Sequence, residues 1–165
     1  MAMEDGVDRI VAQWQRQRPD LDPSPMHVIG RISRLHWALD ERLLRVFSRY
    51  DLGRGEFDVL ATLRRSGEPY ELTAGELGES TMVTSGAVTK RVDRLERAGL
   101  VARRAADDDA RGRLIKLTAR GLQVIDDVVG EHVEHEARLL SGLTGEERDT
   151  LAGLLRKLGQ TLPVD

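Results

Sequence analysis

Hydrophobic residues recur with a helical period near both ends of this 165-residue chain. At the N-terminal end, spacings of i, i+3, i+4 and i+7 predict a helix over residues 4–18. Its apolar face consists of Val7, Ile10, Val11 and Trp14. A proline-containing break, Asp22-Pro23-Ser24-Pro25, follows, and a second helix is expected over residues 25–49.

This second helix is apolar on two sides. One side carries Ile32, Leu35, Leu39, Leu43 and Val46, and the other carries Trp37 and Leu44. A helix of this kind is often buried between two neighbours. We therefore interpret residues 1–50 as N-terminal helices, with an extra helix at 4–18 and a dimerisation helix at 25–49.

The C-terminal part of the chain shows two further helical patterns. The first begins at Thr118 and carries Leu122, Ile125, Val129 and Val133. The second follows Thr144-Gly145-Glu146-Glu147, a capping box in which a hydroxyl and a carboxylate each accept a backbone N–H. Its apolar residues are Leu151, Leu154, Leu155 and Leu158. We interpret residues 119–165 as C-terminal dimerisation helices.

Residues 51–118 combine short helices with a hairpin. Thr73 and Glu76 form a capping box that starts one helix, and residues 84–98 form the next. The apolar stripe of helix 84–98 is Val88, Val92 and Leu95. Gly99 suits the left-handed position that ends it. Two β-prone runs, 100–104 and 113–117, then flank a turn. The fold expected is mainly α with a small β-hairpin wing (α+β): a winged helix-turn-helix with flanking dimerisation helices.

The face of helix 84–98 opposite its apolar stripe suits the major groove of DNA. Recognition helices present base-reading groups near their N-terminus and cations further along. The candidates on this helix are Ser85, Gly86, Thr89, Lys90 and Arg94. Arginines of a wing can hold phosphates or enter the minor groove. The candidates in the wing are Arg103, Arg104, Arg111 and Arg113. A cationic hairpin alone is often only a solvated surface, but the two preceding helices favour DNA.

The charge of the chain is concentrated in this same region. Residues 81–120 contain ten Lys and Arg against five Asp and Glu, a net charge of +5, although the whole chain carries −3. The remainder therefore carries −8. A positive field confined to the proposed reading head is the distribution that attracts phosphate.

Composition excludes several classes of protein. With no cysteine, the chain has no disulfide, no thiolate catalysis and no Cys-ligated metal. It lacks an apolar run of membrane-spanning length and a signal peptide, so we expect a cytoplasmic protein. Without a nucleophile elbow, a phosphate-binding glycine loop or a dinucleotide fingerprint, we expect neither an enzyme nor a cofactor.

His132 and His135 are spaced i, i+3, which can hold zinc beside a carboxylate. We favour a solvated helical face with local Glu–His pairs, and expect no metal.

The arrangement resembles the MarR family of bacterial transcriptional regulators over nearly the whole chain. The resemblance rests on Thr84-Ser85-Gly86-Ala87-Val88-Thr89-Lys90-Arg91, Asp93-Arg94-Leu95-Glu96, Gly99-Leu100-Val101, Asp109-Ala110-Arg111 and Leu117-Thr118. In that family the wing commonly carries Asp-Arg-Arg, whose Asp and second Arg fix the hairpin. Asp109 and Arg111 match these two positions, and Ala110 departs from the pattern. The resemblance implies a homodimeric, ligand-responsive regulator, usually a repressor, that binds a palindromic operator with half-sites about 34 Å apart.

A narrower resemblance is to the urate-responsive branch of the family. It rests on the extra N-terminal helix, Arg18-Pro19-Asp20-Leu21-Asp22, Pro25-Met26, Gly30-Arg31, Phe57-Asp58-Val59-Leu60 and Leu63-Arg64-Arg65-Ser66-Gly67. The branch's ligand-binding residues map by motif onto Trp14, Asp58, Arg65 and Arg91. The resemblance implies urate, xanthine or a related anionic purine as the ligand.

The positions of these residues can also be judged physically. Asp58 and Arg65 are seven residues apart, about 10 Å along a helix axis, too far for an ordinary i, i+4 pair. Arg91 lies within the apolar stripe, so it points toward the protein body and needs an anionic or hydrogen-bonding partner there, for which Asp58 and a bound anion are the candidates. We hypothesise that two arginines and the Trp14 indole clamp a planar anion, which repels Asp58, draws Arg91 inward and displaces the recognition helix.

Three alternatives remain open. A phenolic or other aromatic carboxylate can satisfy the same arginines. A winged helix can also serve as a protein-interaction module without specific DNA binding, which predicts weak dependence of binding on salt. An enzyme acting on the ligand is the third, although the clamp offers no evident general base. Without the motifs, Trp14 reads as hydrophobic packing and Asp58 and Arg65 as an ion-pair network.

Overall fold

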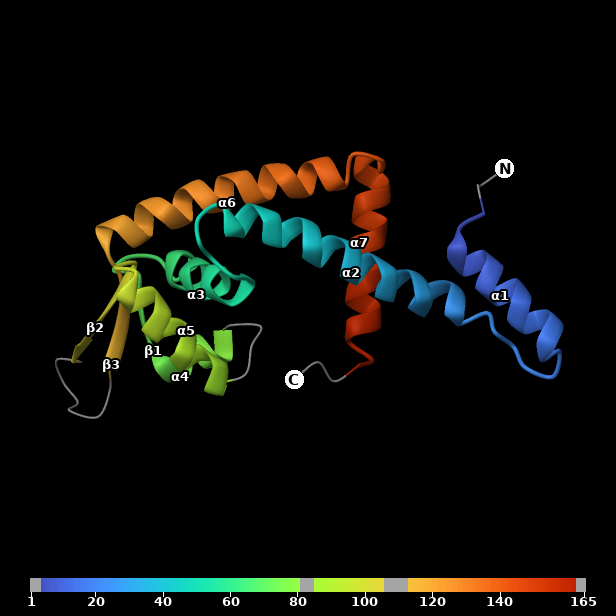
Figure 1. The fold of residues 1–165 in the computed structure, drawn as a ribbon, viewed down its shortest axis with the longest axis horizontal. Helices are drawn as coiled ribbons and strands as arrows, with labels where there is room; N and C mark the ends of the chain where they lie inside the picture. The colour runs from blue at the N-terminus through green and yellow to red at the C-terminus, as the bar shows by residue number, and fades with distance from the viewer. Residues whose placement is uncertain (1–3, 81–84, 106–112, 163–165) are drawn as a thin grey trace. The chain divides into compact units, whose positions relative to one another are not determined.

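The computed structural model of this protein describes residues 4–80, 85–105 and 113–162, and gives the backbone alone for residues 85–87 and 105. Its elements follow the order α1 (Gly6–Gln17), α2 (Met26–Ser48), α3 (Arg54–Arg65), β1 (Glu71–Thr73), α4 (Ala74–Ser80), α5 (Ser85–Arg97), β2 (Val101–Ala105), β3 (Arg113–Leu117), α6 (Ala119–Leu139) and α7 (Gly145–Gly159) (Figure 1). They group into two compact units, residues 1–45 and 46–165, and α2 begins in the first and ends in the second.

In the first unit, a charged cap at the start of α1 contacts α2. Asp5 accepts N–H bonds from Val7 (2.7 Å) and Asp8 (3.1 Å) at the start of α1, and Asp8 accepts in return from Asp5 N–H. The Arg31 guanidinium of α2 reaches Asp5 at 3.0 Å and Asp8 at 2.7 Å. The backbone hydrogen bond from Asp5 and that from Arg31 lower the pKa of Asp8 to about 2. Val7 packs against Gly30, where a Cβ would lie 3.2 Å from a Val7 methyl.

The core of the second unit is built around α5. Its stripe residues Val88, Val92 and Leu95 are buried, as the helical period predicted. The other fully buried apolar side chains come from α2, α3, α4, β2 and α6: Phe47, Val59, Leu60, Leu63, Leu77, Val101, Ile125 and Val128. The capping box that starts α4 is also confirmed, because Thr73 N–H donates to Glu76 at 2.7 Å and Glu76 N–H donates to the Thr73 hydroxyl at 3.2 Å.

The sheet contains one strand that the sequence analysis did not predict. Its order is β1-β3-β2, with both pairs antiparallel. The β2–β3 pair is the expected wing, with Arg103 opposite Ile115. The additional strand, β1, places Leu72 opposite Ile115 on the other side. Three residues are too few to show an alternating pattern, so the sequence contains no signal for β1. The winged helix-turn-helix is confirmed, with a three-stranded sheet among the described residues.

The two C-terminal helices differ in how much of their surface is covered. α6 begins at the N-cap Thr118 and buries Ile125 and Val128. The capping box of α7 is present, yet this helix has no buried residue within the described part of the chain. Its Leu154 is 62% exposed. No helix of the described segments is both long and apolar enough to span a bilayer.

Two glycines of α6 allow a test of how closely this helix is docked. A Cβ at Gly121 would lie 1.9 Å from the backbone oxygen of Leu100, whereas one at Gly130 would meet nothing within 4 Å. We expect Gly121→Ala to lower the free energy of unfolding by about 3 kcal/mol, since backbone cannot yield as a flexible side chain can. Gly130→Ala should raise it by about 0.5–1 kcal/mol through helix propensity. Urea denaturation of both variants measures this, and equal effects would contradict the close docking.

Candidate nucleic-acid interface

The exposed face of α5 is polar. Because the stripe of this helix is buried, Thr89 and Lys90 project on its other side, and both side chains are exposed. Ser85 and Gly86 were also predicted to contact DNA, but the structure describes only their backbone. The described half of the predicted reading face therefore offers a hydroxyl and an ammonium group to a partner.

Arg94, further along α5, also contacts the protein. Its guanidinium lies 3.6 Å from a Glu56 oxygen and 3.4 Å from the Asp51 carbonyl. Glu56 is already used, because its carboxylate accepts the Gly53 N–H at 3.0 Å and caps α3. Both contacts of Arg94 are long, and its side chain is 57% exposed. Arg94 can therefore exchange these contacts for a phosphate.

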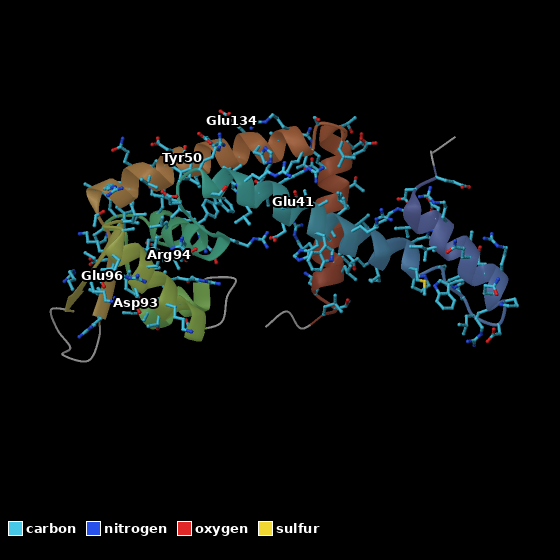
Figure 2. All side chains as sticks on the ribbon, viewed as in Figure 1. Glu41, Tyr50, Asp93, Arg94, Glu96 and Glu134 are labelled. Carbon is cyan, nitrogen blue, oxygen red and sulfur yellow. The ribbon has the colours of Figure 1, made fainter. Side chains whose placement is uncertain are left out.

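Arg103, at the centre of the wing strand β2, differs from the expectation. Its guanidinium pairs with two carboxylates of α5, Asp93 and Glu96, and its N–H donates to Glu96 at 3.2 Å. The hydrogen bond with Asp93, followed by that with Glu96, raises the pKa of Arg103. The side chain is only 21% exposed. Arg103 was predicted to contact DNA, but in the structure an internal ion-pair network holds it (Figure 2 labels Asp93 and Glu96).

Arg104 is similarly engaged by a residue that the sequence analysis missed. It donates to both oxygens of Glu71 on β1, at 3.1 and 2.7 Å, and Lys116 lies 3.9 Å from the same carboxylate. These cations, Arg104 first, lower the pKa of Glu71. Glu71 belongs to the unpredicted strand, which explains why no local pattern revealed it. Arg113 is exposed at the start of β3, while Asp109 and Arg111 lie outside the described residues.

Arg91 points into the protein, as its place in the apolar stripe indicated. Its side chain lies on the backbone at the start of α3, where a Cβ on Gly55 would be 2.1 Å from the Arg91 Nε. Its Nη1 is buried and has no hydrogen-bond partner among the described residues. A buried donor of a charged group without an acceptor is unfavourable, so this nitrogen is available to an anion.

The other three residues assigned to the ligand are placed as follows. Arg65, the last residue of α3, donates from Nη2 to the carbonyl of Ser80, the last residue of α4, at 2.6 Å. Asp58 is half-buried on α3. Trp14 belongs to the first unit, where its side chain is 44% exposed. Arg65 thus lies at the end of α3, which precedes α4 and α5 in the chain. Arg91 lies on α5 itself.

A separate pocket of about 510 Å³ lies beside the last turn of α5. Its polar lining comes from three arginines, two carboxylate residues and a tyrosine: Arg94, Arg97, Arg120, Asp51, Glu56 and Tyr50. Neither Arg65 nor Arg91 lines it. It is therefore distinct from the ligand residues expected from the sequence.

One of the two histidines of α6, His132, lies in a packed environment. His132 lies against the rings of Phe47 and Phe57, with centroids 5.2 and 4.9 Å away, and pairs with Glu136 at 3.2 Å. No group of three His, Asp or Glu residues suited to a metal ion occurs in the described part of the chain. Aromatic packing is thus the role that the structure assigns to His132.

Comparisons with known proteins identify relatives of this arrangement. A family model described as MarR family matches residues 50–112. The chain is 44% identical over 156 residues to the HTH-type transcriptional regulator PecS of Dickeya dadantii, covering 94% of each protein. It is 33% identical to the multiple antibiotic resistance protein MarR of Escherichia coli, covering 79% of this chain and 90% of that protein. These relatives are regulators, in agreement with the prediction that the chain is not an enzyme.

Solved structures are similar in fold. A mutant of E. coli MarR complexed with operator DNA has a TM-score of 0.67 at 29% identity, covering 88% of this chain and 96% of that one. BpsR of Bordetella bronchiseptica, whose DNA binding is regulated by 6-hydroxynicotinic acid, has a TM-score of 0.71 at 23% identity. The match covers 80% of this chain and 92% of that one.

The unpartnered nitrogen of Arg91 leads to a stability prediction. We expect Arg91→Met to raise the free energy of unfolding by about 1 kcal/mol, because a side chain of similar length then fills the site without an unsatisfied donor. Arg103→Met should instead lower it by about 1 kcal/mol, because Asp93 and Glu96 lose their shared cation. Urea denaturation of the two variants compares them. A loss of stability in Arg91→Met as large as that in Arg103→Met would show that Arg91 has a structural partner.

Proposed function

This chain belongs to the MarR family of transcriptional regulators, and from that premise we propose a homodimeric repressor that releases a palindromic operator when it binds urate or a related purine. The observation that carries the DNA-binding part is the polar exposed face of α5, fixed in direction by the burial of Val88, Val92 and Leu95 on the other side. The similarity to an E. coli MarR structure solved on operator DNA supports it.

In this proposal α5 enters the major groove. Thr89 and Lys90 address base edges or phosphate, together with Ser85 and Gly86 at the helix start. Arg94 leaves its long contacts with Glu56 for the DNA backbone. Arg113 and Arg111 of the wing supply further phosphate or minor-groove contacts. Arg104 can take part only if a phosphate replaces the Glu71 carboxylate.

A second copy of the chain is the partner we propose for the exposed apolar residues of α2 and, separately, for those of α7. The exposed residues are Val28, Ile29, Leu35, Trp37, Leu39 and Leu44 on α2 and Leu151, Leu154 and Leu155 on α7. Exposed apolar residues that cluster on one helix mark interaction sites in water. Pairing about a two-fold axis would present two α5 helices to successive turns of the major groove, as a palindromic operator requires.

The ligand proposal rests on two arginines that hold the reading head in place. Arg65 caps the end of α4 through Ser80, and Arg91 lies against Gly55 with one nitrogen unpartnered. An anionic purine that draws both guanidinium groups to itself, assisted by the Trp14 indole and repelling Asp58, would move α4 and α5. Ligand binding and DNA binding would then oppose each other by the same factor.

Salt dependence provides the test of DNA binding. We expect the affinity for operator DNA to fall steeply with ionic strength, and Lys90→Ala to reduce the slope of log K against log salt by about one. Lys157→Ala on α7 is the matched control, because α7 lies at the end of α6 away from the sheet (Figure 1). Fluorescence anisotropy measures both slopes. A slope near zero for the wild type would instead favour a protein-interaction module.

A panel of ligands tests the second part of the proposal. We expect urate or xanthine to raise the melting temperature more than phenolic carboxylates do, and urate to release DNA in a gel-shift titration. Arg91→Ala and Trp14→Phe should still bind DNA but respond to urate with at least tenfold lower sensitivity, which corresponds to about 1.4 kcal/mol. Unchanged release in both variants would rule out this site. A larger shift with salicylate would support an aromatic acid as the ligand.

A further inference from the structure

We propose that Arg103, Asp93 and Glu96 form a clamp that fixes the wing against the recognition helix, and that the two carboxylates are positioning residues for DNA binding. The clamp consists of one cation on β2 between two anions on α5. This inference rests on the DNA-binding function proposed above and assigns a role to residues that the function does not otherwise use.

The clamp joins two consecutive elements, because α5 ends at Arg97 and β2 begins at Val101. Asp93 and Glu96 are spaced i, i+3, so they lie on one side of α5. Nη1 of Arg103 contacts Glu96 and Nη2 contacts Asp93, so both arms of the guanidinium are occupied. Lysine cannot reproduce this arrangement, because its single ammonium group lacks the planar fork that spans two acceptors.

Glu96 also covers the edge of the sheet. In the strand order β1-β3-β2, β2 is an edge strand. The Arg103 N–H bonds to Glu96 at 3.2 Å, so a backbone donor on β2 is satisfied by a carboxylate of α5. Unpaired groups of an edge strand are otherwise open to solvent or to another strand. Side-chain and backbone bonds therefore attach the wing to the helix at the same residue.

The placement of two acidic residues on a DNA-binding helix also needs an explanation. Carboxylates near phosphate weaken binding by repulsion, and Asp93 and Glu96 are 49% and 39% exposed. Asp93 and Glu96 must therefore strengthen DNA binding by more than this repulsion weakens it. A fixed angle between α5 and the wing provides it, since two surfaces held in their bound arrangement lose less freedom when they engage the duplex.

Replacing the two carboxylates should change the affinity for DNA in opposite directions, depending on whether they hold the clamp or are bystanders, that is, acids with no role in positioning the wing. Glu96→Gln and Asp93→Asn each remove a negative charge from the DNA-binding head. If the acids are bystanders, both variants bind operator DNA more tightly. If they hold the clamp, the double variant binds about fivefold more weakly, the loss expected from one net hydrogen-bonded interaction. Glu79→Gln, on the exposed side of α4, removes the same charge from the head and should not weaken binding.

Arg103 itself separates the clamp from a phosphate contact. Arg103→Lys retains the positive charge, so a phosphate contact predicts nearly unchanged affinity and an unchanged salt slope. The clamp predicts that Arg103→Lys binds about as weakly as the Asp93→Asn, Glu96→Gln double variant. Tighter binding by the double variant, or wild-type affinity in Arg103→Lys, would overturn the proposal.

Amide hydrogen exchange tests the clamp without DNA. The Arg103 amide should exchange faster in the double variant than in the wild type, while the Ile125 amide in the core of α6 should not change. If the wild type fails to bind any DNA, the proposed function fails, and the exchange measurement still decides whether the clamp exists. Unchanged exchange at Arg103 would remove the basis of the inference.

Discussion

Burial of one stripe of α5 is the constraint on which the rest of the head depends. Once Val88, Val92 and Leu95 are inside, every other side chain of the helix has a fixed direction. Thr89 and Lys90 face outward, and Arg91 faces α3. Because 3.6 residues make a turn, neighbouring residues of one short helix serve three different surfaces. The core therefore sets the geometry of both proposed binding activities.

Local signals in the sequence were sufficient for the buried stripe of α5 and for the capped starts of α4 and α7. The stripe of α5 and the capping boxes of Thr73 and Thr144 depend on residues within a few positions, and each was predicted. Contacts between residues far apart in the sequence were not predicted. Glu71 meets Arg104 over 33 positions, and β1 pairs with a strand more than 40 residues away. Neither contact leaves a periodic trace, so the engagement of Arg104 could not be anticipated.

The same distinction applies to the site residues. The inward direction of Arg91 followed from helical geometry, but Gly55 beneath it could not be identified, because a glycine shows its role only through what occupies the space beside it. The charge count for residues 81–120 was correct as a sum. It overstated the cations available to phosphate, since Arg103 and Arg104 are already paired with acids. A net charge describes the long-range field, whereas local pairing decides which groups can bind.

Gly55 has a consequence for how such a regulator can diverge. If Arg91 reports the ligand as proposed, the resting balance between DNA-bound and released protein is set by how well its guanidinium lies on the α3 backbone. A methyl group at position 55 would shift that balance while leaving unchanged every residue that contacts DNA or ligand. Relatives with identical binding residues can thus differ in basal repression and in ligand threshold through a single position that touches neither partner.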